Sequence, residues 1–207
     1  MRPILFILIS TVILATSCMS SKTVIRKYYT LDPGNTEYAD RQDNTPMPGK
    51  AEIGLVSIDP VYEKNQIVNR SNSHEITYYM YHQWAVRPAE AIRGLVYEYL
   101  DKNRIFDEVS TRYSRTVPDY IVDINVHNLE VVESKDEFSA HLRLEMNLVK
   151  AENDSLMLSY TVNRTSPLRE KDMNLFASEI SSLLVEETGN FSSEIRQISI
   201  SRQAGQR

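Results

Sequence analysis

The sequence is poor in the residues that build several common kinds of site. Its 207 residues contain one cysteine, six glycines and four histidines. One cysteine leaves no partner for an intramolecular disulfide, and so few glycines leave no glycine-rich loop to cradle a phosphate. The histidines show no metal-ligand spacing, and there is no nucleophile elbow and no catalytic pair of carboxylates. We therefore expect neither an enzyme nor a bound metal or cofactor. His127 and His141 fall on the polar faces of adjacent predicted strands, where we expect a solvated cross-strand pair.

The chain also lacks a cluster of basic residues. Its 23 Lys and Arg against 28 Asp and Glu give a formal net charge of −5. Binding to a nucleic-acid backbone requires a basic patch, so nucleic acid is not an expected partner. Charged residues at 25% and hydrophobic residues at 42% are typical of globular proteins. The length is that of one domain.

The N-terminal segment has the pattern of a bacterial lipoprotein leader. Arg2 supplies a positive end, and residues 4–15 are almost entirely apolar but too few to span a bilayer comfortably. The only cysteine follows in Leu14-Ala15-Thr16-Ser17-Cys18, which resembles a lipobox with its leucine one position early. We expect residues 1–17 to be a signal peptide and Cys18 to carry the lipid. The alternatives are a plain secretory leader with an incidental Cys18, or cleavage elsewhere.

Acylation of Cys18 would hold the protein permanently at a membrane, because each buried methylene adds about 0.8 kcal/mol. Met19 follows in place of the aspartate that signals retention in the inner membrane, so we expect the outer membrane, with the body on its periplasmic face. Residues 18–27 then form a polar tether, in which about eight residues reach at most roughly 28 Å. We expect one domain over residues 28–200 and a polar tail over 201–207.

Three segments in the second half predict an antiparallel meander. Apolar and polar residues alternate over 120–131, 138–148 and 156–162, as in strands with one face toward water. The alternation changes phase after Asn128, where we expect a bulge.

Two amphipathic segments predict helices that cover this meander. The first is Arg87–Lys102, and the second is Asp172–Ile198, with a break or kink at 188–190. The fold class expected is therefore α+β, with a mixed, mainly antiparallel sheet and two long helices packed on one face.

The first half predicts strands around a loop. We expect a short strand at 28–31, a loop over 32–50, a strand over 53–61, an extended segment at 66–70 and a strand over 75–84.

The last of these strands contains the run Tyr-Tyr-Met-Tyr-His-Gln-Trp and is bulky on both faces. Burial between other elements would explain it. A contact surface is the other interpretation, because Tyr, Trp and Met are enriched at binding hot spots. The candidate surface consists of Tyr62, Gln66, Arg70, Tyr79, Tyr81 and Trp84.

The order of short motifs carries a family resemblance. Gln66-Ile67-Val68-Asn69-Arg70 is followed by Trp84-Ala85 at the start of a helix. This order resembles the ABC-type transport auxiliary lipoproteins, which include those of paraquat-inducible intermembrane transport systems. That family typically has a Leu-Pro-x-Tyr turn, where this chain has Val61-Tyr62-Glu63-Lys64-Asn65.

The resemblance implies an accessory, non-catalytic subunit of an MCE-type ABC lipid transport system in a Gram-negative bacterium. It also implies docking to an MCE-domain protein and homo-oligomerisation. Two alternatives stay open: a periplasmic carrier with an apolar cavity for a lipid or hydrophobic ligand, and a generic envelope-assembly lipoprotein.

Overall fold

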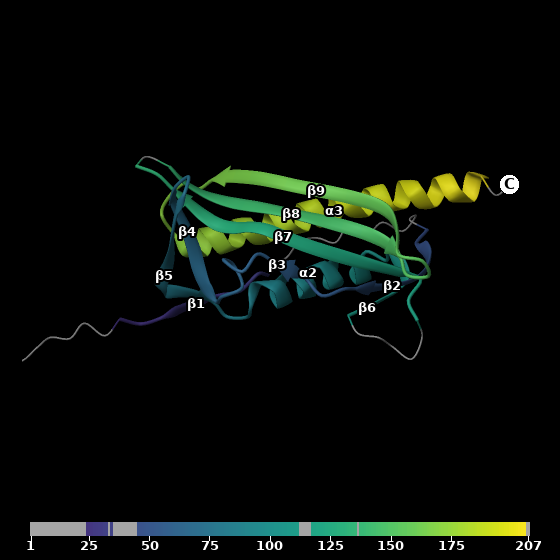
Figure 1. Ribbon diagram of the computed structural model, residues 1–207, viewed down its shortest axis with the longest axis horizontal. Coiled ribbons are helices and arrows are strands. Elements are labelled where there is room, and N and C mark those ends of the chain that lie inside the picture. Colours follow the sequence, from purple (N-terminus) through teal and green to yellow (C-terminus); the bar gives the residue numbers. More distant parts are fainter. Residues whose placement is uncertain (1–23, 33, 35–44, 112–116, 136, 206–207) are drawn as a thin grey trace, which may run out of the picture.

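The structure, a computed structural model, describes residues 24–32, 34, 45–111, 117–135 and 137–205, with side chains as far as Ser201. The leader, Cys18 and the first part of the tether lie outside these residues. The described chain has the expected α+β fold, with a mixed, mostly antiparallel sheet of nine strands and two helices on one face (Figure 1). No helix in the described ranges is long and apolar enough to cross a membrane.

Strand β7 (Tyr120–Glu133) organises the sheet. One of its edges pairs along its length with β8 (Phe138–Lys150), and β8 pairs with β9 (Ser155–Pro167), both antiparallel. The predicted meander is therefore confirmed. Its predicted bulge is also present, because the β7–β8 register shifts between Val126 and Asn128. The shift lets the chain bury Val126 on one side of the bulge and Leu129 on the other.

The other edge of β7 pairs with three short parallel strands in succession. Strand β2 (Met47–Ile53) lies beside its start, β3 (Ser57–Ile58) beside its middle and β4 (Gln66–Asn72) beside its end. On this side of β7 the sheet therefore has two separate branches, which begin with β2 and β4, and the short β3 lies between them.

Each of the two larger strands extends the sheet further. Strand β2 pairs with β6 (Phe106–Ser110) at one end of the molecule. At the other end, β4 pairs with β5 (Glu75–Trp84), and β5 carries β1 (Lys27–Tyr29) as the last strand (Figure 1). We call residues 66–84, which form β4 and β5, the β4–β5 arm.

The predicted strand over 53–61 is confirmed only in part, because β2 ends at Ile53 and only the short β3 forms within the rest of the span. The chain is already a strand at Met47, inside the predicted loop, and it leaves the sheet after Ile53. The reason is a close approach at Gly54, whose N–H donates to the carbonyl of Val122 at 3.0 Å. A Cβ built on Gly54 would lie 2.5 Å from Oδ1 of Asp123, so no larger residue fits there without displacement. The alternation in the sequence does not reveal this interruption.

Helix α2 (Pro88–Lys102) starts at its proline, as predicted, because a helix's first turn needs no N–H donor there. Helix α3 (Met173–Gly205) is capped by Asp172, whose Oδ1 accepts hydrogen bonds from the N–H groups of Asn174 at 2.6 Å and Leu175 at 2.9 Å. The α3 helix packs across β8 and β9, and α2 packs against β6 and β2.

The predicted break in α3 at 188–190 is absent. The helix continues through Gly189 and reaches Gly205, so the predicted polar tail from Ser201 begins as helix. A Cβ on Gly189 would lie 2.8 Å from Oη of Tyr99 on α2. The glycine therefore serves the close contact between the two helices and does not end one of them.

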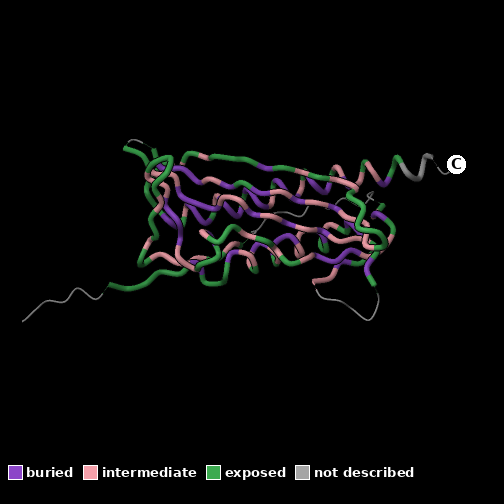
Figure 2. Tube along the Cα trace, viewed as in Figure 1, coloured by how far each residue is buried: buried purple, intermediate pink, exposed green. Residues whose placement is uncertain are grey.

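The core fills the space between the helices and the sheet, where buried segments of both layers face each other (Figure 2). Trp84 lies in it, with its ring centroid 5.7 Å from that of Phe176 on α3. The rest of β5 is less buried than two-sided packing requires, since Tyr78, Met80 and Tyr81 are 36%, 67% and 39% exposed. Two-sided burial is therefore wrong for the aromatic run, which presents side chains to solvent.

Candidate docking surface

A buried carboxylate on β7 holds the β4–β5 arm in place, on the face of the sheet that is turned away from the helices. The side chain of Glu130 is completely buried. Its Oε2 accepts a hydrogen bond from Oη of Tyr62 at 2.7 Å, and its Oε1 accepts one from Nε of Arg70 at 2.7 Å. Nδ2 of Asn128 and Nδ1 of His141 lie 3.1 and 3.2 Å from the same Oε1. We call these five residues the Glu130 cluster. A buried charge with this many partners is tolerated, whereas one that lost its cation would be costly.

The electrostatics of the Glu130 cluster keep its carboxylate ionised. Burial alone would raise the pKa of Glu130, but hydrogen bonds from His141, Arg70 and Tyr62 together hold that pKa at about 2. The hydrogen bond to Glu130 raises the pKa of His141. Burial and the same carboxylate raise the pKa of Tyr62 to about 12. Tyr62 is therefore a neutral donor at physiological pH.

The cluster also corrects the predicted pairing of histidines. Strand β8 places His141 opposite Glu130, because the bulge after Val126 shifts the register. Nε2 of His141 lies 3.0 Å from Oδ1 of Asn163 on β9. His127 is not its partner in this register.

A second cluster fastens the arm on the face that carries the helices. Glu133 accepts hydrogen bonds from Nζ of Lys171 at 2.6 Å, Oη of Tyr79 at 3.1 Å and Nδ2 of Asn69 at 3.2 Å. The hydrogen bond from Lys171, just before α3, is the main reason why the pKa of Glu133 is lowered. This Glu133 cluster ties both strands of the arm to the start of α3.

The arm in turn holds β1. Oη of Tyr29 lies 2.8 Å from Nδ1 of His82, and the N–H of Ala85 donates to the carbonyl of Tyr29 at 2.8 Å. Burial lowers the pKa of His82, which favours its neutral form as the partner of the tyrosine hydroxyl.

Four of the six predicted surface residues turn out to fasten the arm. Tyr62 and Trp84 are only 4% and 3% exposed, so their inclusion in a contact surface is corrected. Arg70 and Tyr79 donate to Glu130 and Glu133. Large amphipathic side chains suit both a contact surface and internal packing, so the sequence alone does not distinguish these two roles. The partner strand must be known before burial shows which role a residue has.

The other two predicted residues remain accessible. Tyr81 is 39% exposed. Gln66 lines a groove of about 1040 Å³ between β3, residues 63–66 and the start of α2. We call it the β3–α2 groove, and its walls include Leu55, Ile58, Lys64, Gln66, Arg87 and Glu90.

The β3–α2 groove offers backbone as well as side chains. Within the described part of the chain, β3 pairs only with β7, so its second edge has no strand beside it. Leu55, just before β3, is 84% exposed. An unpaired strand edge next to an apolar residue and flanking charges is the arrangement to which extended peptides bind.

Sequence patterns alone do not identify the Glu130 cluster. Its members come from four places in the chain, and only β7 and β8 bring His141 beside Glu130. The one signal is a glutamate between Leu129 and Val131, where the apolar alternation has just changed phase. Across the described residues, no group of three or more His, Cys, Asp or Glu side chains is arranged to hold a metal ion.

The comparisons with known proteins agree with this architecture. The chain resembles a crystal structure of a Xanthomonas campestris protein with a TM-score of 0.66 and 16% identity over 78% of this chain and 91% of that one. A second crystal structure, of an uncharacterized protein, gives a TM-score of 0.63 and 13% identity over 83% of this chain and 99% of that one. The structure of a hypothetical protein from Chlamydia trachomatis gives a TM-score of 0.50 and 5% identity over 74% of this chain and 99% of that one. These likenesses concern the fold alone.

A comparison with curated proteins gives no match. A family model described as "ABC-type transport auxiliary lipoprotein component" matches residues 29–188, which run from the end of β1 to near the middle of α3. The chain therefore belongs to the family of ABC-type transport auxiliary lipoprotein components.

Proposed function

We propose that this protein is the outer-membrane-anchored docking subunit of an MCE-type ABC system that transports lipid between the inner and outer membranes. The β3–α2 groove is the observation that carries the docking role, and the family supplies the link to an ABC transporter. The subunit makes and breaks no bond, and ATP is hydrolysed by another subunit.

The occupant of the groove is an extended segment of the MCE-domain subunit. Such a segment adds to the unpaired edge of β3 through main-chain hydrogen bonds. Leu55 supplies an apolar contact, and Lys64 and Arg87 supply cations for acidic groups on the partner. The fastened β4–β5 arm forms one wall and keeps Gln66 in place.

Anchoring rests on Cys18. The acylated cysteine holds the domain at the periplasmic face of the outer membrane and raises its local concentration around the transporter. Radioactive palmitate fed to cells should label the wild type but not Cys18→Ser, and density-gradient separation of membranes should place the wild type in the outer-membrane fraction. Labelling of both proteins, or an inner-membrane position, would contradict this part of the proposal.

Docking is tested by crosslinking in intact cells, purification through a C-terminal tag and mass spectrometry. The wild type should recover an MCE-domain protein with its permease and ATPase. Leu55→Asp places a charge in the groove and should reduce that recovery by roughly tenfold, as expected for the loss of about 1.4 kcal/mol of binding free energy. Val117→Asp is the matched control, since Val117 is 81% exposed and does not line the groove. Recovery of an unrelated outer-membrane machine instead would favour a generic envelope-assembly lipoprotein.

We also propose that copies of the chain associate through β9. This strand of 13 residues pairs only with β8 among the described strands, and long free edges are normally covered. Leu156 is 60% exposed, and a groove of about 570 Å³ lies between Leu158 and Ile198 of α3. Native mass spectrometry should detect a closed oligomer for the wild type and a smaller species for Thr161→Pro. A wild type that is monomeric at micromolar concentration would contradict it.

A further inference from the structure

We propose that the domain lies directly on the lipid surface through one corner of the sheet, formed by Val24, Ile25, Tyr28, Met80 and Tyr81. We call it the β1–β5 corner. The inference rests on the proposed acylation of Cys18 and adds to it a second contact with the same membrane, made by the folded body. The occupant is a lipid headgroup layer that carries anionic phosphates.

An irregularity in β5 pushes two of these side chains outward. In the pairing with β4, Tyr78 lies opposite Val68 and Gln83 lies opposite Gln66. Over this interval β5 therefore advances by five residues while β4 covers only two. The extra residues of β5 must loop away from the ladder. Tyr79 and His82 turn inward to Glu133 and Tyr29, while Met80 is left 67% exposed and Tyr81 39% exposed.

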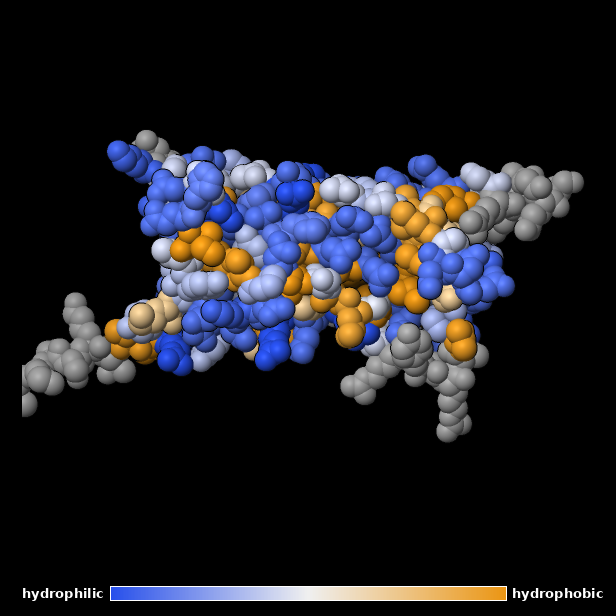
Figure 3. All heavy atoms as spheres, viewed as in Figure 1, coloured by the Kyte–Doolittle hydropathy of each residue, from blue (hydrophilic) through white to orange (hydrophobic). Residues whose placement is uncertain are grey.

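Strand β1 adds the remaining apolar residues beside this loop. Its register with β5 sets Lys27 opposite His82 and Tyr28 opposite Gln83. Tyr28 is 59% exposed, and Val24 and Ile25 just before it are 54% and 75% exposed. Figure 3 shows apolar side chains gathered at this corner of the molecule, next to the grey N-terminal atoms. Such a concentration of exposed apolar residues marks an interaction site.

The length of the chain places this corner at the membrane. Val24 follows Cys18 by six residues, and six fully extended residues span at most about 20 Å. An acyl chain buried at Cys18 therefore keeps the corner within about 20 Å of the headgroups, at a high effective concentration. Other exposed apolar residues, such as Leu156 on β9, belong to parts of the fold that the tether does not constrain in this way.

The charge of the corner suits anionic lipid. Residues 24–28 include Arg26 and Lys27 and no acid, and both basic residues are exposed. This local positive charge contrasts with the net charge of −5 for the whole chain. Tyrosines beside basic residues are typical of protein surfaces at the membrane–water interface.

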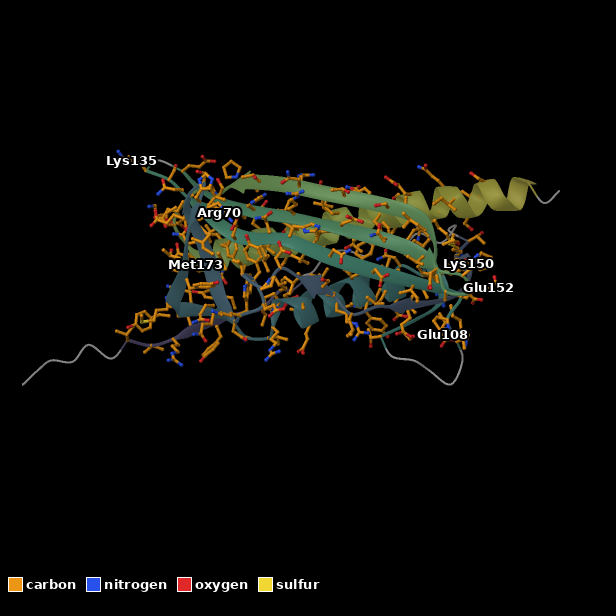
Figure 4. The ribbon with its side chains drawn as sticks, in the orientation of Figure 1. Arg70, Glu108, Lys135, Lys150, Glu152 and Met173 are labelled. Carbon is orange, nitrogen blue, oxygen red and sulfur yellow. The ribbon has the colours of Figure 1, made fainter. Side chains whose placement is uncertain are left out.

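Contact at this corner would also orient the domain. Arg70 and Met173 lie toward the end of the sheet that carries β1 and β5, whereas Glu108, Lys150 and Glu152 lie at the opposite end (Figure 4). The end with Lys150 and Glu152 would then project away from the membrane.

The test uses the full-length protein, acylated in cells, purified in detergent and reconstituted into vesicles of phosphatidylethanolamine and phosphatidylglycerol. Because Cys18 is the only cysteine and its thiol is consumed by the lipid, Met80→Cys provides a single thiol for the environment-sensitive dye NBD. Glu152→Cys is the control at the far end of the sheet. The label at position 80 should brighten roughly twofold or more on reconstitution and be quenched by lipids that carry a nitroxide, whereas the label at 152 should do neither.

Each other outcome overturns the proposal in a distinguishable way. A label at 80 that behaves like the one at 152, in protein that floats with the vesicles, overturns the corner contact and leaves the anchor intact. Brightening at 80 in detergent alone, with oligomers present, assigns the corner to a second copy of the chain. Protein that does not float and whose N-terminal peptide lacks the acyl mass overturns the anchor together with the corner contact.

Discussion

Nε of Arg70 lies 2.7 Å from Oε1 of Glu130, whose carboxylate is completely buried. The pair joins the β4–β5 arm to the central strand of the sheet. The arginine that ends the family-like motif Gln66–Arg70 thus has a structural function, since it holds the wall of the β3–α2 groove in place. The docking that we propose would therefore depend on the same contact that stabilises the fold.

Removal of Arg70 should destabilise the fold. Arg70→Met keeps most of the apolar stem but leaves the buried carboxylate without its cation, which we expect to cost about 3 kcal/mol. The measurement is urea unfolding followed by fluorescence of Trp84, the only tryptophan, which is 3% exposed. Lys150→Met, in an exposed pair with Glu152, is the control and should leave the unfolding midpoint unchanged. Equal midpoints for the two variants would contradict the role of the Glu130 cluster.

Stability should depend on pH through the same cluster. The pKa of Glu130 is lowered from 4.5 to about 2, so its contribution is present above pH 4.5 and is lost as pH falls toward 2. The pKa of His141 is raised above 6.5, so its contribution is present below pH 6.5 and is lost as pH rises through the higher folded value.

The free energy of unfolding contributed by the cluster should therefore be greatest between about pH 4.5 and 6.5. Urea unfolding across pH for the wild type and two variants measures it. His141→Gln should lose the decline above pH 6.5 and keep much of the acid decline, whereas Glu130→Gln should lose both. An unchanged alkaline decline in His141→Gln would show that another group causes it.

The packing of α2 against α3 should make Gly189→Ala unfavourable in the wild type. Alanine gains about 1 kcal/mol of helix propensity, but its Cβ would lie 2.8 Å from Oη of Tyr99. Tyr99→Phe removes that oxygen and leaves Cζ at an ordinary 3.5 Å. Thermal unfolding should therefore show that Gly189→Ala stabilises the Tyr99→Phe protein and fails to stabilise the wild type. The same gain in both backgrounds would mean that the contact exerts no constraint.

The Glu133 cluster should govern local motion of the arm more than global stability. Lys171 is 60% exposed, so Lys171→Met should change the free energy of unfolding by less than about 1 kcal/mol. It should nevertheless speed hydrogen exchange in β5, because Tyr79 shares the same carboxylate. Exchange that rises equally in β6, which includes Glu108 at the opposite end of the sheet, would indicate general destabilisation instead.

Sequence periodicity predicts the meander, the bulge after Asn128 and α2 well, because each of these depends on local alternation or spacing. It fails where a contact distant in sequence decides the outcome. Gly54 ends β2 because the chain passes close to Asp123, and Gly189 lies inside α3 because it meets Tyr99. A glycine in either place has the local pattern of a turn or a helix end.

The candidate site, too, could be predicted only where local sequence patterns determine it. The aromatic run of β5 is recognisable in the sequence, but which of its residues face solvent depends on the irregular pairing with β4. Tyr79 is bound to Glu133 while its neighbour Met80 is exposed. No pattern within β5 indicates Glu130, which lies in another strand, as the residue that holds the arm.

The central claim is that the β3–α2 groove docks the MCE-domain subunit. A photocrosslinking amino acid at position 55 in otherwise wild-type cells tests it most directly, with position 117 as the exposed control outside the groove. We predict a crosslink from position 55 to the MCE-domain protein and none from position 117. Crosslinks from position 55 only to other copies of this chain, or to an unrelated outer-membrane protein, would contradict the claim.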